Sequence, residues 1–207
     1  MQLGIEFVLS SLFVIIILLP LYLYRKRIFR FLYDKNDISL FVKNIQIYLS
    51  NNITNIKFDY SIVKKVEHEH DSRIKQTLIV EDLVSQFANF SYSLGTQRPV
   101  NKDNLWATYE QESKPLNGKS PKDLIRRKEV SWRRDHERCN RCGIKIRLME
   151  SHLMLVKPIE KGGTYHFENM AIFCSDCYRL LNSKNVDTTV KDLKLQDILM
   201  DKAIIQF

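Results

Sequence analysis

The chain has little cysteine, and all of it lies in one stretch. Four of the 207 residues are cysteines, and they fall between residues 132 and 184. They form two pairs, Cys139 with Cys142 and Cys174 with Cys177, and 31 residues separate the pairs. Two disulfides or a redox-active pair would need an oxidising environment or a thioredoxin-like context, and the sequence supplies neither.

Two closely spaced cysteine pairs are typical of a metal site. A C-x-x-C turn places two thiolates on one side of a tight loop, and two such turns can close a four-sulfur zinc site. Such a site is structural because no coordination position remains open for a substrate. We therefore predict zinc as a structural cofactor bound by all four cysteines, with a small folded element between the pairs.

The N-terminus lacks any Lys or Arg before its apolar run. Residues 7–24 carry no charge, and a helix of that length covers about 27 Å, close to the thickness of a bilayer core. The missing basic residues and the missing small-residue cleavage site argue against a signal peptide, and Arg25, Lys26 and Arg27 follow directly. We therefore expect a single-pass anchor in the cell membrane, with the N-terminus outside and the C-terminal domain in the cytoplasm.

No motif identifies the role of residues 36–98. The spacing of apolar residues predicts a helix over 39–49, and alternation predicts strands over 56–62 and 73–80 before a further helix over 81–92. The expected fold class is therefore α+β. It would combine a transmembrane helix, a small α+β region and a zinc module.

The same patterns predict where the parts of the chain begin and end. The segment between the α+β region and the cysteines is polar and rich in turn residues, which indicates a linker. The expected parts, in chain order, are the transmembrane anchor with a basic cytoplasmic flank (1–35), the α+β region (36–98), the linker (99–119), the zinc domain (120–185) and a C-terminal helix (186–207).

Motifs between and before the cysteine pairs add a resemblance to a known family. They are the turn Lys157-Pro-Ile-Glu-Lys-Gly-Gly163, the run Glu168-Asn-Met170 and the lead-in Arg134-Asp-His-Glu-Arg-Cys139. In this order, with these cysteines, they resemble the zinc-containing form of the HNH endonuclease family over about residues 130–185. The resemblance implies a ββα-metal fold: a hairpin, a loop with the proline and the two glycines, and a helix beginning near the second pair.

The resemblance also assigns roles to positions, and several positions depart from the pattern. In the family, a histidine three residues before the proline is the general base. Its neighbour and the residue after the last cysteine help to hold a divalent ion, and an asparagine orients the site. Here these positions are Leu155, Met154, Tyr178 and Asn169. A leucine cannot accept a proton, so the resemblance implies a nuclease-like protein whose phosphodiesterase activity is lost or altered.

Two histidines offer a replacement general base. His152 shares a strand face with Met154, and a bulge or shifted register could turn it inward. His166 lies shortly before Asn169 in the sequence. The candidate catalytic residues are therefore His152, His166 and Asn169. Magnesium or another divalent ion would be a cofactor only if such a site survives.

The charge of the chain indicates possible partners. The net charge is +8, and residues 121–185 carry 14 Lys or Arg against 8 Asp or Glu. A basic patch of this kind suits phosphate backbones, although an anionic membrane also attracts it. The candidate nucleic-acid-binding residues are Arg126, Arg127, Arg133, Arg134, Arg138 and Arg141.

These observations predict a membrane-anchored, HNH-endonuclease-like protein with a structural zinc site that binds or acts on DNA or another nucleic acid. The alternative is a zinc-stabilised membrane adaptor that binds a protein partner and no nucleic acid.

Overall fold

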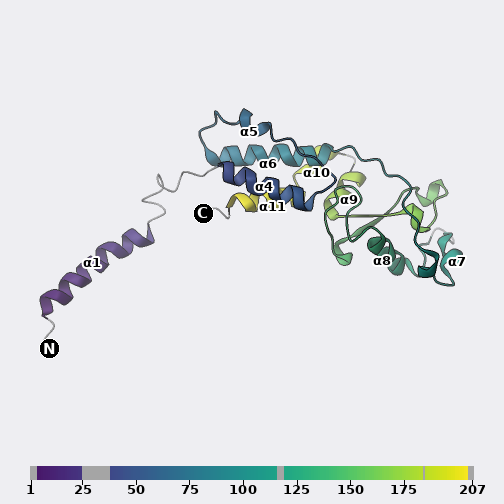
Figure 1. Ribbon diagram of the computed structural model, residues 1–207, viewed down its shortest axis with the longest axis horizontal. Helices are drawn as coiled ribbons and strands as arrows, with labels where there is room; N and C mark the ends of the chain where they lie inside the picture. The colour runs from purple at the N-terminus through teal and green to yellow at the C-terminus, as the bar shows by residue number, and fades with distance from the viewer. Residues whose placement is uncertain (1–3, 25–37, 116–118, 184, 205–207) are drawn as a thin grey trace. The chain divides into compact units, whose positions relative to one another are not determined.

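A computed structural model describes residues 4–24, 38–115, 119–183 and 185–204 (Figure 1). The chain divides into two compact units, Met1–Ser39 and Leu40–Phe207. The described residues are mostly helical, at 56%, with one two-stranded sheet. The predicted α+β class is therefore wrong.

The first unit contains the helix α1, Ile5–Leu23. Among the residues that the structure describes, no helix combines the length and apolar content needed to cross a bilayer. The predicted transmembrane anchor, the membrane as a partner and the location across the cell membrane are therefore wrong. The predicted basic flank, residues 25–35, lies outside the described residues.

Residues 38–89 form helices, and the two strands predicted there are absent from the described chain. The helices are α4 (Ile38–Asn52), α5 (Ile62–Lys65) and α6 (Ser72–Asn89). The carboxylate of Asp71 caps α6 by accepting from the Arg73 N–H at 2.8 Å. Ile79, Leu83 and Phe87 are buried on α6 at intervals of four residues, which is a helical period. The predicted strand over 73–80 is the first half of this helix, because its apolar residues continue that longer period.

The C-terminal residues complete the core of these helices. Helices α10 (Val186–Val190) and α11 (Lys194–Ile204) both contact α6. Lys202 of α11 lies 4.9 Å from the ring centroid of Tyr48 in α4. The predicted C-terminal helix exists as α10 and α11, and it packs on the helical region around α6. Figure 1 draws α4, α6 and α11 together.

The segment interpreted as a linker is packed into the second unit. It contains a 3-10 turn, η1 (Lys102–Asn104), and a short helix, α7 (Tyr109–Ser113). Tyr109 forms a buried cluster with Phe167 and Met170, and its ring stacks on that of Phe167 at 5.0 Å. Residues 116–118 of this segment lie outside the described residues.

The cysteine-containing part follows, and it holds the sheet. Strand β1 pairs antiparallel with β2, with His152 opposite Phe173 and Leu155 opposite Met170. Both strands are short, and β2 is entirely buried against α8 on one side. The elements in order are α8 (Leu124–Arg134), η2 (Leu148–Glu150), β1 (His152–Leu155), η3 (Ile159–Lys161), η4 (Phe167–Asn169), β2 (Met170–Phe173) and α9 (Ser175–Asn182).

Candidate metal centre

The first cysteine pair lies in a tight turn after α8. The Cys139 N–H donates to the Ile144 carbonyl, and the Gly143 N–H donates to the Cys139 carbonyl, both at 2.9 Å. Gly143 has a φ of +79°, in the left-handed region that favours glycine. A Cβ at this position would also collide with the side-chain oxygen of Thr54. The backbone therefore closes the turn only because residue 143 is glycine.

The second pair joins the end of β2 to the start of α9. Cys174 is the N-cap of α9, and its sulfur accepts from the Cys177 N–H at 3.4 Å. The Cys177 N–H is one of the donors in the first turn of α9 that lack a partner within the helix, and the Cys174 sulfur supplies that partner. The second pair is thus held by a strand end and a helix start, with little backbone freedom.

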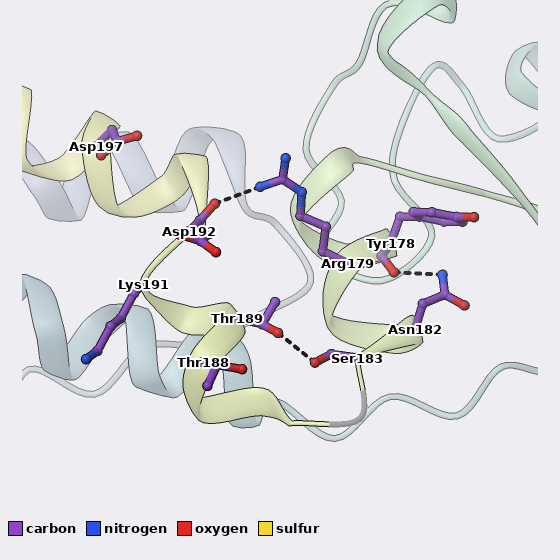
Figure 2. A pocket seen from close by; sticks show the side chains of 9 residues that line it. All are labelled: Tyr178, Arg179, Asn182, Ser183, Thr188, Thr189, Lys191, Asp192 and Asp197. Atoms are coloured by element: carbon purple, nitrogen blue, oxygen red, sulfur yellow. Dashed lines mark hydrogen bonds between the residues drawn. The ribbon is translucent and has the colours of Figure 1, made fainter.

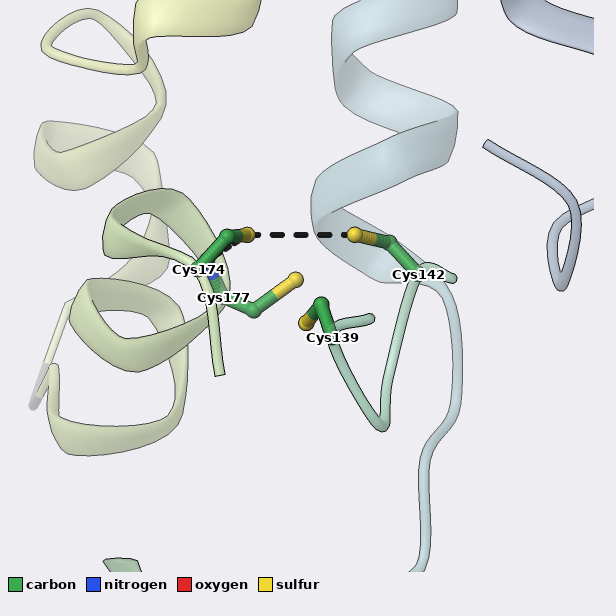
Figure 3. A group of neighbouring side chains, drawn as sticks. All are labelled: Cys139, Cys142, Cys174 and Cys177. Carbon is green, nitrogen blue, oxygen red and sulfur yellow. Dashed lines mark hydrogen bonds between the residues drawn. The ribbon is translucent and has the colours of Figure 1, made fainter. Parts of the chain in front are cut away.

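The structure brings all four cysteines together (Figure 3). Their sulfur atoms lie within 4.8 Å of one another, and the sulfurs of Cys142 and Cys174 are 3.8 Å apart. A tetrahedral site with zinc–sulfur bonds of about 2.3 Å has sulfur–sulfur edges of about 3.8 Å. Cys139, Cys142 and Cys177 are buried, and all four are free of disulfides. The predicted cluster is confirmed: the four cysteines lie close together and could bind a metal ion such as zinc.

The thiols strongly influence one another. A hydrogen bond with the Cys139 sulfur is the main factor that raises the pKa of both Cys142 and Cys177. Burial acts to raise the pKa of Cys139 itself, but hydrogen bonds from the other three sulfurs outweigh burial and hold that pKa well below its ordinary value. The close approach of the four sulfurs thus couples their protonation, and a bound ion would replace protons on them.

Two of the six candidate arginines are buried, a third has a side chain that is only 7% exposed, and all three serve the fold. Arg127 is fully buried and donates to Asp123, to Ser113 and to two backbone carbonyls. Arg134 pairs with Asp135 at 2.7 Å and donates to two carbonyls next to β2. Arg141 is 2% exposed and lies against Cys177. Their guanidinium groups are occupied within the protein.

The other three arginines are exposed. Arg126 lies 4.3 Å from the ring centroid of Trp106, Arg133 pairs with Glu129 at 2.6 Å, and Arg138 donates to the Gly143 carbonyl at 2.8 Å. The predicted basic cluster is therefore divided into a buried half and an exposed half, and only the exposed half is accessible to a polyanion.

The three candidate catalytic residues lie in different surroundings. The His152 Nε2 is 3.3 Å from the Ser175 hydroxyl, and its ring stacks on Tyr178 at 4.6 Å. The His166 Nε2 is 3.9 Å from a carboxylate oxygen of Glu110. His152 pairs across the sheet at one end of β1, whereas Asn169 directly precedes β2 at the other end, about 13 Å away along the strand direction. The structure therefore does not assemble His152 and Asn169 into one site.

Asn169 holds the loop between the strands. Its side chain accepts from the Lys157 N–H at 2.6 Å and donates to the carbonyls of Lys157 and Thr164 at 2.9 and 2.7 Å. Gly163 lies so close to this segment that a Cβ there would collide with the Lys157 carbonyl oxygen. The asparagine and the glycine thus fix the loop, and the hydrogen bonds of the asparagine side chain are made within the loop.

Leu155 on β1 faces hydrocarbon. Leu153 and Leu155 both pack against the cluster of Tyr109, Phe167 and Met170, because alternate residues of a strand share a face. Met154 and His152 point to the other face, toward α9. There the Asn182 amide lies 4.0 Å from the Met154 sulfur. The histidine of β1, His152, therefore lies on the face opposite to Leu155.

The charges around His152 are positive. Burial lowers the pKa of His152, and the charges of Lys128, Arg179 and Lys194 lower it further. These three residues come from α8, α9 and α11 respectively. Sequence analysis missed this convergence, because no spacing in the sequence relates Lys128 to Lys194.

An open groove of about 800 Å³ lies between α9 and the C-terminal helices (Figure 2). Arg179 donates to the Asp192 carbonyl at 2.9 Å, and the hydroxyls of Ser183 and Thr189 are 2.6 Å apart. The lining is polar and of mixed charge. It consists of Tyr178, Arg179, Asn182, Ser183, Thr188, Thr189, Lys191, Asp192 and Asp197.

Comparisons of the chain with protein-family models, with curated proteins and with solved structures found no match.

Proposed function

We propose that the chain is a nucleic-acid-binding protein built on a zinc-stabilised, HNH-endonuclease-like module that no longer hydrolyses phosphodiesters. The order of elements supports this proposal. Two antiparallel strands, β1 and β2, are joined by a loop with Pro158 and Gly163, and α9 follows with the second cysteine pair at its start. The resemblance likewise implies a hairpin, a loop with the proline and the glycines, and a helix near the second cysteine pair, although here that loop joins the two strands of the hairpin.

Zinc is the ion that the donor set fits best. Four sulfur ligands at tetrahedral spacing favour zinc over hard ions such as magnesium, which prefer oxygen. All four ligand positions would be filled by protein, so the ion would stabilise the fold and leave no position for a reacting water. Cys139, Cys142, Cys174 and Cys177 would hold it.

The surroundings of β1 support the loss of hydrolysis. Leu155 packs against aromatic and apolar side chains, and a hydrocarbon side chain can neither accept a proton nor bind a metal ion. A placed general base typically contributes a factor of about 10²–10⁴ to the rate. Met154 and Tyr178 replace the remaining metal-binding positions, so magnesium is not proposed as a cofactor.

The observation that carries the binding proposal is the set of positive side chains around His152. Lys128, Arg179 and Lys194 all act on the imidazole, and its Nε2 lies beside the Ser175 hydroxyl. A positive potential at a hydroxyl and an imidazole suits a phosphate group, which combines negative charge with several hydrogen-bond acceptors. We name this group of residues the His152 cluster. It would contact the backbone of a nucleic acid and read no sequence.

The test is binding of the full chain to duplex DNA and to single-stranded RNA over a range of salt concentrations. Affinity should fall steeply with salt, and Lys128→Ala should reduce the slope of log affinity against log salt by about one. Lys122→Ala is the matched control, because Lys122 is an exposed lysine shortly before α8, and it should leave the slope unchanged. Equal slopes for both variants would exclude the His152 cluster as the contact.

Cleavage is tested separately with supercoiled plasmid and magnesium or manganese. We expect no nicking by the wild-type protein. Nicking that is abolished by His152→Ala would overturn the proposed loss of hydrolysis, while leaving the binding proposal in place.

A zinc-stabilised adaptor that binds a protein partner is the second candidate. The burial of Arg127, Arg134 and Arg141 favours it, because these guanidinium groups are not available to a polyanion. Absence of nucleic-acid binding at about 50 mM salt, where electrostatic binding is strong, would select this candidate.

A further inference from the structure

Arg141 connects the two cysteine pairs to a distant helix. It lies inside the first C-x-x-C turn, yet its Nη1 is 3.6 Å from the sulfur of Cys177 in the second pair. Its Nη2 donates to the carbonyls of Phe87, Ala88 and Phe90 at 2.8, 3.1 and 3.0 Å. One buried guanidinium therefore contacts both a sulfur ligand and the end of α6.

The contacts at α6 have a clear physical role. The helix ends at Asn89, and the last carbonyls of a helix have no partners within the helix. A cation at a helix C-terminus satisfies such carbonyls and opposes their partial negative charge. The guanidinium also lies 5.1 Å from the ring centroid of Phe87 and 5.6 Å from that of Phe90.

The contact with Cys177 has a separate role. Four thiolates and one zinc ion carry a net charge of about −2, and a buried charge needs a partner of opposite sign. A hydrogen bond from a guanidinium to a ligand sulfur offsets part of that charge and fixes the direction of the sulfur. Asn55 supports the same turn, because its N–H donates to the Cys142 carbonyl at 3.3 Å.

We propose that Arg141 is a positioning residue that couples metal binding at the four cysteines to the order of the C-terminal end of α6. The inference rests on the zinc site proposed above. Occupancy of the site would hold the guanidinium in place through the sulfur of Cys177, and the guanidinium would hold the last turn of α6. Loss of the ion would loosen that turn.

The experiment compares the full-length wild type with Arg141→Gln, Arg141→Lys and the control Arg138→Gln. Arg138 also precedes a cysteine and donates to a carbonyl of the same turn, but it is exposed and contacts no sulfur in the described structure. Three quantities are measured: the rate of zinc release to a chelator, the sulfur-to-metal absorption bands of the cobalt-substituted protein, and amide exchange at residues 87–90.

We expect Arg141→Gln to release zinc at least about tenfold faster, the size typical for loss of a residue that supports a metal ligand. Its cobalt bands should shift, and exchange at residues 87–90 should be fast with or without metal. In the wild type and in Arg138→Gln, exchange there should be slow with zinc and fast without it. Arg141→Lys keeps the positive charge but not the geometry of the guanidinium. Its rate of zinc release should therefore lie between the rates of the wild type and of Arg141→Gln.

Each other outcome excludes a specific part of the inference. Unchanged zinc release and cobalt bands in Arg141→Gln, with faster exchange, would mean that Arg141 only caps α6, and the coupling would be wrong. If the rate of amide exchange at residues 87–90 of the wild type does not change when zinc is removed, the coupling is also wrong. This outcome is decisive even if every Arg141 variant fails to fold. Absence of zinc from the wild type by elemental analysis would instead remove the proposed zinc site, and this inference with it.

Discussion

Arg127 and Arg133 lie in the same helix, α8, but differ completely in their surroundings. Arg127 is fully buried and bonds Asp123 at 2.7 Å together with the carbonyls of Tyr109 and Tyr165. The Arg133 side chain is 70% exposed and pairs only with Glu129 among the described residues. The two arginines should therefore contribute very differently to stability.

Replacement of Arg127 by methionine should lower the free energy of unfolding by about 3–5 kcal/mol, because it leaves Asp123 without its buried partner. Arg133→Met removes one exposed pair and should change that free energy by less than about 1 kcal/mol. Urea unfolding of both variants measures the difference. Equal effects would mean that Arg127 is not the connection between α7, α8 and the loop at Tyr165.

At the scale of elements, α9 and α11 are joined by one carboxylate. Asp176 in the first turn of α9 accepts from the N–H groups of Lys194 and Leu195 at 3.1 and 3.0 Å. These are the first two residues of α11, whose N–H groups lack partners within the helix. Asp176 is only 8% exposed, so water cannot readily replace it.

Replacement of Asp176 by alanine should lower the free energy of unfolding by about 1–3 kcal/mol, since two N–H groups lose their acceptor in a largely buried position. Amide exchange should increase first at Lys194 and Leu195. The control is Asp201→Ala, at an exposed position of α11. Its free energy of unfolding should stay within about 0.5 kcal/mol of that of the wild type. Faster exchange throughout the protein would instead indicate global destabilisation.

The elements themselves differ from those that periodicity predicts. Residues 73–80 alternate well enough for a strand, but they belong to the 18-residue helix α6. The reason is that Leu83 and Phe87, beyond the alternating stretch, extend the apolar period to four residues and pack in the core. The prediction placed Leu83 and Phe87 in a separate helix over 81–92, whereas residues 72–89 form one continuous helix.

At the scale of the whole second unit, the four-cysteine cluster connects parts of the chain that are far apart in sequence. Its first pair follows α8 and contacts the end of α6, and its second pair joins β2 to α9. Binding of an ion therefore fixes segments that are far apart in sequence. The stability of the unit should depend on zinc concentration.

At a free zinc concentration 100 times the dissociation constant, binding adds about 2.7 kcal/mol to the free energy of unfolding. For a unit of this size this corresponds to a rise in Tm of about 5–10 °C. Removal of zinc should lower Tm by the same amount. Added zinc should restore Tm fully, and added magnesium should not.

Tm should also depend more on zinc at pH 8 than at pH 6, because protons compete with the ion for thiolates. Calorimetry with and without chelator measures these shifts in Tm. A Tm that is the same with and without chelator would contradict stabilisation of the unit by a bound ion.

The sequence by itself determined the four-cysteine cluster. The spacing of each C-x-x-C pair is local, and a tight turn or a helix start sets the relative position of its two sulfurs, so the four cysteines could be assigned without knowledge of the fold. Asn169 and Gly163 were likewise marked by their place in the loop motif, although the sequence did not indicate that the asparagine is occupied in fixing that loop.

Only the tertiary structure decided which charges are accessible and which side chains meet. Arg134 is buried by carbonyls 33 and 36 residues later in the chain, and Arg141 by a helix end 54 residues earlier. The positive groups around His152 come from three separate helices. Burial and convergence of this kind depend on contacts between distant segments, and residue type and local spacing do not contain that information.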